Sequence, residues 1–139
     1  MILKNGYIIL NNELVKKDIL INNGLIEKID DEINGTDVID INNKLVIPGA
    51  VDVHVHLREP GYSHKETIKS GTLSSAKGGI TTIMSMPNLN PCPDTLENLK
   101  VQEDIIARDA LVNVYPYAAV TVGEKGAQMA DFESTKSSA

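Results

Sequence analysis

The chain has 139 residues, about the length of one ordinary domain, and its 42% hydrophobic and 23% charged residues are typical of soluble globular proteins. The formal net charge of -6 argues against a nucleic-acid partner, which would require clustered Lys and Arg. No signal-peptide pattern and no apolar run of roughly 18 residues is present, which argues against a membrane partner. The single cysteine excludes an internal disulfide and fits a reducing compartment. We therefore expect a cytoplasmic protein.

The first 47 residues contain short β-rich runs separated by turn signals. Asn and Gly dominate the breaks, as at Asn5-Gly6 and Asn23-Gly24, and both tolerate the positive φ of tight turns. We expect antiparallel meander strands with one buried face, at residues 7–10, 14–21, 25–29, 37–41 and 45–47. A sheet of this size makes a poor independent core, so it is expected to pack on something else.

The pattern changes at Pro48-Gly49, where strands begin to alternate with helices. The expected order is a strand at 50–57, a helix at 65–77, a strand at 80–86, a helix at 94–109 and a strand at 111–119. Gly78-Gly79 is expected to stop the first helix. Asp94 and Glu97 together resemble a capping box at the start of the second helix. A weak helix pattern begins at Asp131. This order predicts an α/β fold with a parallel sheet and right-handed crossovers.

The strand at 50–57 carries the most informative motif, in which polar and apolar residues alternate. A side-chain period of two would place the apolar residues on a buried face and Asp52, His54, His56 and Arg58 together on the other. Two imidazoles at this spacing can bind one metal ion, and zinc or another borderline divalent ion suits them. Two ordinary hydrogen-bonding histidines are the alternative. Because burying this polar face costs several kcal/mol unless it is paired, we favour His54 and His56 as metal ligands.

Arg58 and Asn88 are the candidate substrate-binding residues. Arg58 could be a surface charge and Asn88 a turn residue, but both follow the carboxyl ends of predicted parallel strands. That edge of the sheet carries the site in barrels and in doubly wound sheets. A guanidinium can bind a carboxylate through two parallel hydrogen bonds. We therefore predict that Arg58 is a carboxylate clamp and that Asn88 is its neighbour.

Several of these segments together resemble a known family. They are residues 48–61 with His-x-His followed by Arg58-Glu59-Pro60-Gly61, then Lys65-Glu66, Gly78-Gly79-Ile80-Thr81-Thr82 and Met86-Pro87-Asn88. Taken together, they resemble the amino-terminal part of bacterial-type dihydroorotases of the amidohydrolase superfamily. The resemblance spans essentially the whole chain. It implies an incomplete (β/α)8 barrel of the TIM type at residues 49–139, preceded by part of a small β-sandwich at residues 1–48.

The resemblance also implies a function. Such enzymes interconvert N-carbamoyl-L-aspartate and L-dihydroorotate in de novo pyrimidine biosynthesis and depend on one or two zinc ions. His54 and His56 would bind zinc, while Arg58 and Asn88 would hold the substrate carboxylate with His56 close by. Zinc would polarise the ring carbonyl and lower the pKa of a water molecule. We expect a small-molecule substrate, with a homo-oligomer or an assembly with other pyrimidine-pathway enzymes as further alternatives.

The resemblance marks what the chain lacks. The remaining metal ligands and the general acid/base aspartate lie on later strands in the family, beyond residue 139. We therefore expect the isolated 139-residue chain to be inactive. Two alternatives fit the same residues: a non-catalytic scaffold or partner-binding subunit, and a related cyclic amidohydrolase acting on a hydantoin, a dihydropyrimidine or allantoin.

Overall fold

The computed structural model describes residues 1–131. The chain divides into two compact units, Met1–Pro48 and a second that begins at Gly49. We call them unit 1 and unit 2. The boundary lies where the sequence pattern changes from short β-rich runs to alternating strands and helices. The helix pattern that begins at Asp131 would occupy residues 132–139 and lies outside the described residues.

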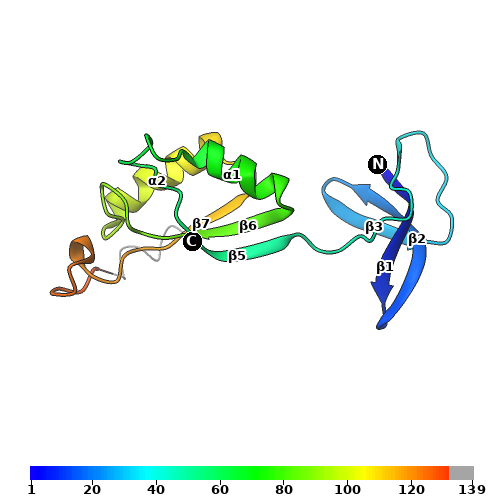
Figure 1. The fold of residues 1–139 in the computed structure, drawn as a ribbon, viewed down its shortest axis with the longest axis horizontal. Coiled ribbons are helices and arrows are strands. Elements are labelled where there is room, and N and C mark those ends of the chain that lie inside the picture. The colour runs from blue at the N-terminus through cyan, green and yellow to red at the C-terminus, as the bar shows by residue number, and fades with distance from the viewer. Residues whose placement is uncertain (132–139) are drawn as a thin grey trace. The chain divides into compact units, whose positions relative to one another are not determined.

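Unit 1 is a four-stranded sheet in the order β3-β2-β1-β4 (Figure 1). The strands β1 (Ile2–Leu10), β2 (Glu13–Asn22) and β3 (Leu25–Asp30) form the expected antiparallel meander. The short strand β4 (Val38–Asp40) pairs in parallel with β1, so the prediction of a wholly antiparallel sheet was wrong. The reason is topological, because the chain after β3 crosses to the opposite edge of the sheet. Residues 45–47 form no strand, although Leu45 makes a single bridge to Tyr7.

The predicted turn at Asn5-Gly6 is instead a β-bulge inside β1. Leu3 pairs with Ile19 and Gly6 with Lys17, so β1 has one residue more than β2 between these pairs. The buried carboxylate of Asp18 accepts hydrogen bonds from the backbone N–H of Asn5 (3.1 Å) and of Ile33 (3.0 Å). Asn5 adopts a φ of 61°, which Asn tolerates in a turn or in a bulge. The sequence therefore predicted the positive φ of Asn5 correctly, but this residue lies in a β-bulge and not in a turn between two strands.

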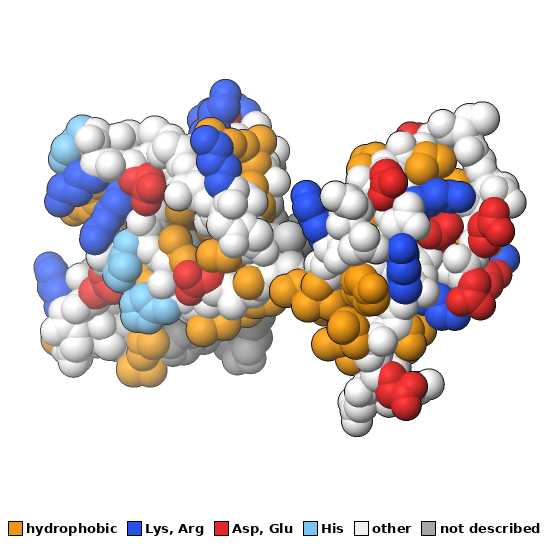
Figure 2. All heavy atoms as spheres, turned by 45° about the vertical axis from the view of Figure 1, so that its right-hand side comes forward, with side chains coloured by type: hydrophobic (Ala, Val, Ile, Leu, Met, Phe, Trp, Pro, Cys, Tyr) orange, Lys and Arg blue, Asp and Glu red, His pale blue; other side chains and the backbone are white. Residues whose placement is uncertain are grey.

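One face of unit 1 is apolar and open. A groove of about 360 Å³ is lined by apolar side chains of all three long strands and of residues 46–48. Among them, Ile26 and Ile47 are each 64% exposed. Figure 2 shows hydrophobic side chains gathered on one side of this unit. An exposed apolar surface of this kind is expected where a protein packs on further protein.

Unit 2 is a βαβαβ unit with a parallel three-stranded sheet in the order β5-β6-β7, as predicted. Its strands are β5 (Ala50–Val55), β6 (Ile80–Ser85) and β7 (Asn113–Pro116), and its helices are α1 (Ile68–Lys77) and α2 (Leu96–Asp109). A short 3-10 turn, η1 (Val122–Glu124), follows. Both helices lie on the same side of the sheet in Figure 1. No helix in residues 1–131 is long and apolar enough to cross a membrane.

The core of unit 2 lies between this sheet and its helices. Leu57, Ile68 and Ile83 are its buried centre, and residues such as Ile105 and Ile106 of α2 pack against them. The opposite face of the sheet is open, since Val51 and Val53 are each 57% exposed. The third strand is shorter than the predicted 111–119. The hydroxyl of the buried Thr72 accepts a hydrogen bond from the Leu111 N–H (3.2 Å), which ties this residue to α1 before β7 begins.

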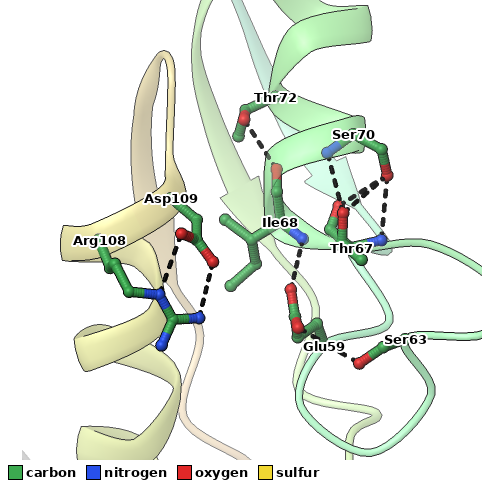
Figure 3. Close-up of polar contacts among 8 residues, drawn as sticks. All are labelled: Glu59, Ser63, Thr67, Ile68, Ser70, Thr72, Arg108 and Asp109. Atoms are coloured by element: carbon green, nitrogen blue, oxygen red, sulfur yellow. Dashed lines mark hydrogen bonds and ion pairs between the residues drawn. The ribbon is translucent and has the colours of Figure 1, made fainter.

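Both helices begin later than predicted because threonines cap them. Thr67 and Ser70 form a capping box at the start of α1, so the helix does not begin at Lys65 (Figure 3). Thr95 accepts a hydrogen bond from Asn98 N–H at the start of α2, so Asp94 is not the N-cap. The predicted stop at Gly78-Gly79 is confirmed, with Gly79 at a φ of 79°.

Replacing Asp18 with Ala should destabilise unit 1. The substitution leaves two backbone N–H groups without their acceptor, which costs about 1–3 kcal/mol when such groups are buried. Urea unfolding of the protein at its natural length measures the loss, with Glu27→Ala on the exposed part of β3 as the matched control. Equal stability of the two variants would contradict this role.

The same carboxylate should make unit 1 sensitive to acid. Burial raises the pKa of Asp18, but hydrogen bonds from Ile33 and Asn5 and the nearby Lys4 outweigh it and lower the pKa below its usual value. Its stabilising contribution is therefore complete above about pH 4 and is lost as the pH falls through the folded-state pKa. Amide hydrogen exchange at Asn5 and Ile33, followed from neutral to acidic pH, tests this sign.

Replacing Gly71 with Ala should destabilise unit 2, although Ala is the better helix former. A Cβ at this position would lie 2.6 Å from Cδ2 of Leu57, which is buried and cannot move aside freely. Overpacking of this kind typically costs about 1–3 kcal/mol. Thermal unfolding is the measurement, and Ser74→Ala on the exposed side of α1 is the control that should be neutral or stabilising. An unchanged Gly71→Ala protein would show that Leu57 has room to shift.

Candidate active site

The His-x-His motif lies on a bulged strand. Asp52 pairs with Ile83 and Val55 with Ser85, so β5 has one residue more than β6 between these pairs. The strand ends at Val55, and the prediction that it continues to residue 57 with strict alternation was wrong. A bulge shifts the side-chain alternation, so Val55 packs on the core although Val51 and Val53 are exposed on the other face. The His54 N–H donates to Asp52 Oδ1 (3.1 Å) within the bulge.

The bulge still brings the two imidazoles together. The ring centroids of His54 and His56 are 5.2 Å apart, in an edge-on arrangement. His54 is exposed and His56 is half-buried. Figure 2 shows histidine side chains at the surface of unit 2, with acidic and basic side chains around them. The pair is therefore accessible to a ligand from outside the chain.

The amide of Asn88 holds His56 in one orientation. Asn88 follows β6, and its Oδ1 lies 2.8 Å from Nδ1 of His56. With the amide oxygen as acceptor, Nδ1 carries the hydrogen and Nε2 keeps its lone pair. A second group that fixes the tautomer in this way is the usual companion of a metal-binding histidine. The two sequence-predicted residues thus meet directly across the ends of neighbouring strands.

The donor set fits part of a metal site. Two neutral imidazoles are suitable ligands for zinc, and catalytic zinc usually has three protein ligands. Residues 1–131 contain no group of three or more His, Cys, Asp or Glu side chains placed to hold one ion. The described residues therefore offer two candidate ligands, fewer than a catalytic zinc centre usually has.

Arg58 and Asn88 line one pocket of about 420 Å³. Arg58 follows the buried Leu57 and has a φ of 61°, a backbone conformation that is uncommon for a residue with a side chain. Such conformations concentrate at functional sites. The structure also brings residues to this pocket that sequence analysis did not assign to it: Tyr62, Leu89, Cys92, Gly123 and Glu124. Lys65 lines the pocket as well.

The loop between β5 and α1 is fixed by its own hydrogen bonds. The carbonyl of Arg58 accepts from Tyr62 N–H (2.9 Å), and the carbonyl of Tyr62 accepts from Lys65 N–H (2.8 Å). The carboxylate of Glu59 accepts from the Ile68 N–H at the start of α1 (2.8 Å) and from the Ser63 hydroxyl (3.3 Å), as Figure 3 shows. An acidic group at a helix N-terminus is electrostatically favourable. The pocket wall from Arg58 to Lys65 is therefore an ordered loop.

A buried carboxylate brings the segment after β7 to the pocket. Asp94 accepts from Gly123 N–H (2.7 Å) and from the Asn98 side-chain amide (3.1 Å). The bond from Gly123 holds the pKa of Asp94 below its usual value, against the effect of burial. Gly123 and Glu124 thereby reach the pocket. Their position after the third parallel strand was the sequence signal that could have found them.

Cys92 lies in the same pocket. Burial raises its pKa, and the carboxylates of Asp94 and Glu124 raise it further. A thiol in this state is mostly protonated at neutral pH and is a weak nucleophile. His64 is exposed, and its ring centroid lies 6.5 Å from that of Tyr62.

Comparison with curated proteins identifies relatives. Dihydroorotases of Bacillus thuringiensis (strain Al Hakam) and Bacillus anthracis are each 50% identical to this chain over 136 residues. The matched region is 96% of this chain and 32% of either relative. The chain therefore spans about a third of the length of these relatives.

Solved structures share the fold. An L-hydantoinase (dihydropyrimidinase) from Arthrobacter aurescens superposes with a TM-score of 0.79 at 28% identity, covering 88% of this chain and 28% of its own. A D-hydantoinase (dihydropyrimidinase) from Thermus sp. gives a TM-score of 0.70 at 30% identity, and the match covers 86% of this chain and 27% of the hydantoinase. A profile of the family described as dihydro-orotase-like matches residues 43–139. On this match and on the identity to dihydroorotases, the chain belongs to the dihydro-orotase-like family and corresponds to the amino-terminal portion of a dihydroorotase.

Proposed function

We propose that the protein carrying this chain is a zinc-dependent cyclic amidohydrolase that interconverts N-carbamoyl-L-aspartate and L-dihydroorotate in de novo pyrimidine biosynthesis. The observation that carries the proposal is the position of Asn88, which bonds to His56 on one side and lines a pocket with Arg58 on the other. A candidate metal ligand and a candidate carboxylate clamp therefore share one neighbour. In this proposal, unit 2 is the first part of a (β/α)8 barrel.

Arg58 and Asn88 would bind and orient the substrate carboxylate. The planar guanidinium of Arg58 can donate two parallel hydrogen bonds to it. Because Oδ1 of Asn88 is engaged with His56, its side-chain NH₂ is the part left to donate to a substrate oxygen. The substrate carboxylate does not react. Holding the substrate by this group places its ring amide in a defined position relative to the histidines, which lowers the entropic cost of reaction.

His54 and His56 would hold the metal ion. Zinc bound there would supply Lewis-acid chemistry to the cyclic amide. Asn88 would keep His56 in the tautomer that presents Nε2. The other metal ligands and the general acid/base aspartate are proposed to come from later strands of a longer chain, consistent with the 32% coverage of the relatives.

The second candidate is a hydantoinase or dihydropyrimidinase, which the structural likeness favours at 28–30% identity. The pocket distinguishes the two candidates. A cationic Arg58 facing the substrate suits a ring that carries a carboxylate, whereas an uncharged hydantoin or dihydropyrimidine would leave that cation unpaired.

Replacing Arg58 with Met tests the proposed substrate in the protein at its natural length. Loss of a charge-assisted bond should lower kcat/KM for dihydroorotate by about 100-fold. Turnover of dihydrouracil, the same ring without the carboxylate, should stay within about threefold. Steady-state assays with zinc supplied make the comparison. A wild-type protein that hydrolyses dihydrouracil but not dihydroorotate would refute the proposal and favour the second candidate.

Replacing Asn88 with Leu should weaken metal binding without removing a ligand. Nδ1 of His56 loses its acceptor, and loss of such a partner typically costs about 10–100-fold in metal affinity. Asn88→Asp keeps an acceptor at the same place and is the matched control for affinity. Competition with a zinc chelator measures both variants. Equal affinity of the Leu variant and the wild type would show that His56 does not bind the ion.

A further inference from the structure

The pocket that holds Arg58 and Asn88 contains a second cation, Lys65. We propose that Lys65 is a second anion-binding group, which contacts the substrate carboxylate together with Arg58 and so selects carboxylate-bearing rings. The inference rests on the proposed function and names a specificity residue for that site.

The backbone places Lys65 at a set distance from Arg58. Two successive turns join them, through Tyr62, and a further hydrogen bond joins Asn90 N–H to the Pro60 carbonyl (3.3 Å). Gly61 has a φ of 95°, and any side chain there would collide with the Asn90 carbonyl. The loop that carries Lys65 is therefore packed against the loop after β6. Because α1 begins only at Ile68, Lys65 belongs to the pocket wall.

The ring of Tyr62 supports the ammonium group. Nζ of Lys65 lies 5.6 Å from the centroid of that ring, within the range of a cation–π interaction. Tyr62 itself lines the pocket. Within residues 1–131, the observed ion pairs do not include Lys65. The aromatic ring thus positions the cation without neutralising it, which leaves its charge for a ligand.

The chemistry of the pocket fits a carboxylate. Its charged side chains are Arg58, Lys65 and the single carboxylate of Glu124, so cations outnumber anions. A ligand carboxylate has about four lone-pair sites. A bidentate guanidinium uses two of them, and the others can accept from the Asn88 amide and from the compact, rotatable ammonium of lysine.

Protection of Cys92, followed at this residue by peptide mass spectrometry, tests the inference in the protein at its natural length. Cys92 lines the same pocket, so bound dihydroorotate should slow its alkylation by iodoacetamide at mildly alkaline pH. Lys65→Met should raise the dihydroorotate concentration for half-protection about tenfold, and Lys65→Arg should restore it. Lys100→Met on the exposed surface of α2 is the matched control and should behave as wild type. In turnover, Lys65→Met should raise KM for dihydroorotate with kcat nearly unchanged, as loss of uniform binding requires.

Each result of these experiments either supports or overturns the inference about Lys65. Unchanged half-protection in Lys65→Met overturns the inference, as does a loss that Lys65→Arg fails to restore, since the charge would then not be responsible. Failure of dihydroorotate to protect Cys92 in the wild type also overturns it. A further result would be that Lys65→Met weakens the protection while the wild-type protein shows no dihydroorotase activity. That result would overturn the proposed function and leave the role of Lys65 standing.

Discussion

The burial of Leu57 is the constraint on which the candidate site depends. Its side chain is 1% exposed and packs with Ile68 of α1 and Ile83 of β6. Gly71 leaves room for this side chain, because the Cβ of any larger residue there would clash with Leu57. On either side of this buried residue lie His56, which belongs to the histidine pair, and Arg58, which lines the pocket with Asn88. A site held by core packing can be precise, whereas a free loop would have to be ordered by its ligand.

Asn88 links the two halves of the site. Its hydrogen bond to His56 joins the carboxyl ends of β5 and β6, and the same side chain lines the pocket of Arg58. Parallel strands bring such residues together because their carboxyl ends lie at one edge of the sheet. Substrate orientation and metal binding would then be coupled through one amide.

Carboxylates that accept backbone N–H groups organise both units. Asp18 stabilises the bulge of β1, Glu59 caps α1, and Asp94 holds Gly123 beside the pocket. Each satisfies a donor that regular secondary structure leaves unpaired, which is where a buried or half-buried acceptor is worth most. The lowered pKa values of Asp18 and Asp94 are the electrostatic consequence of this arrangement.

The sequence by itself determined the βαβαβ order, the family and the four candidate residues, because hydrophobic period and glycine stops are local signals. It did not determine where strands end or which face a residue takes. One bulge in β5 placed Val55 on the core side although Val51 and Val53 are exposed, and one in β1 turned an apparent turn signal into part of a strand. Gly123 and Glu124 joined the pocket only because the distant carboxylate of Asp94 binds the Gly123 N–H. Contacts between residues far apart in the chain, which no local pattern encodes, decided these features.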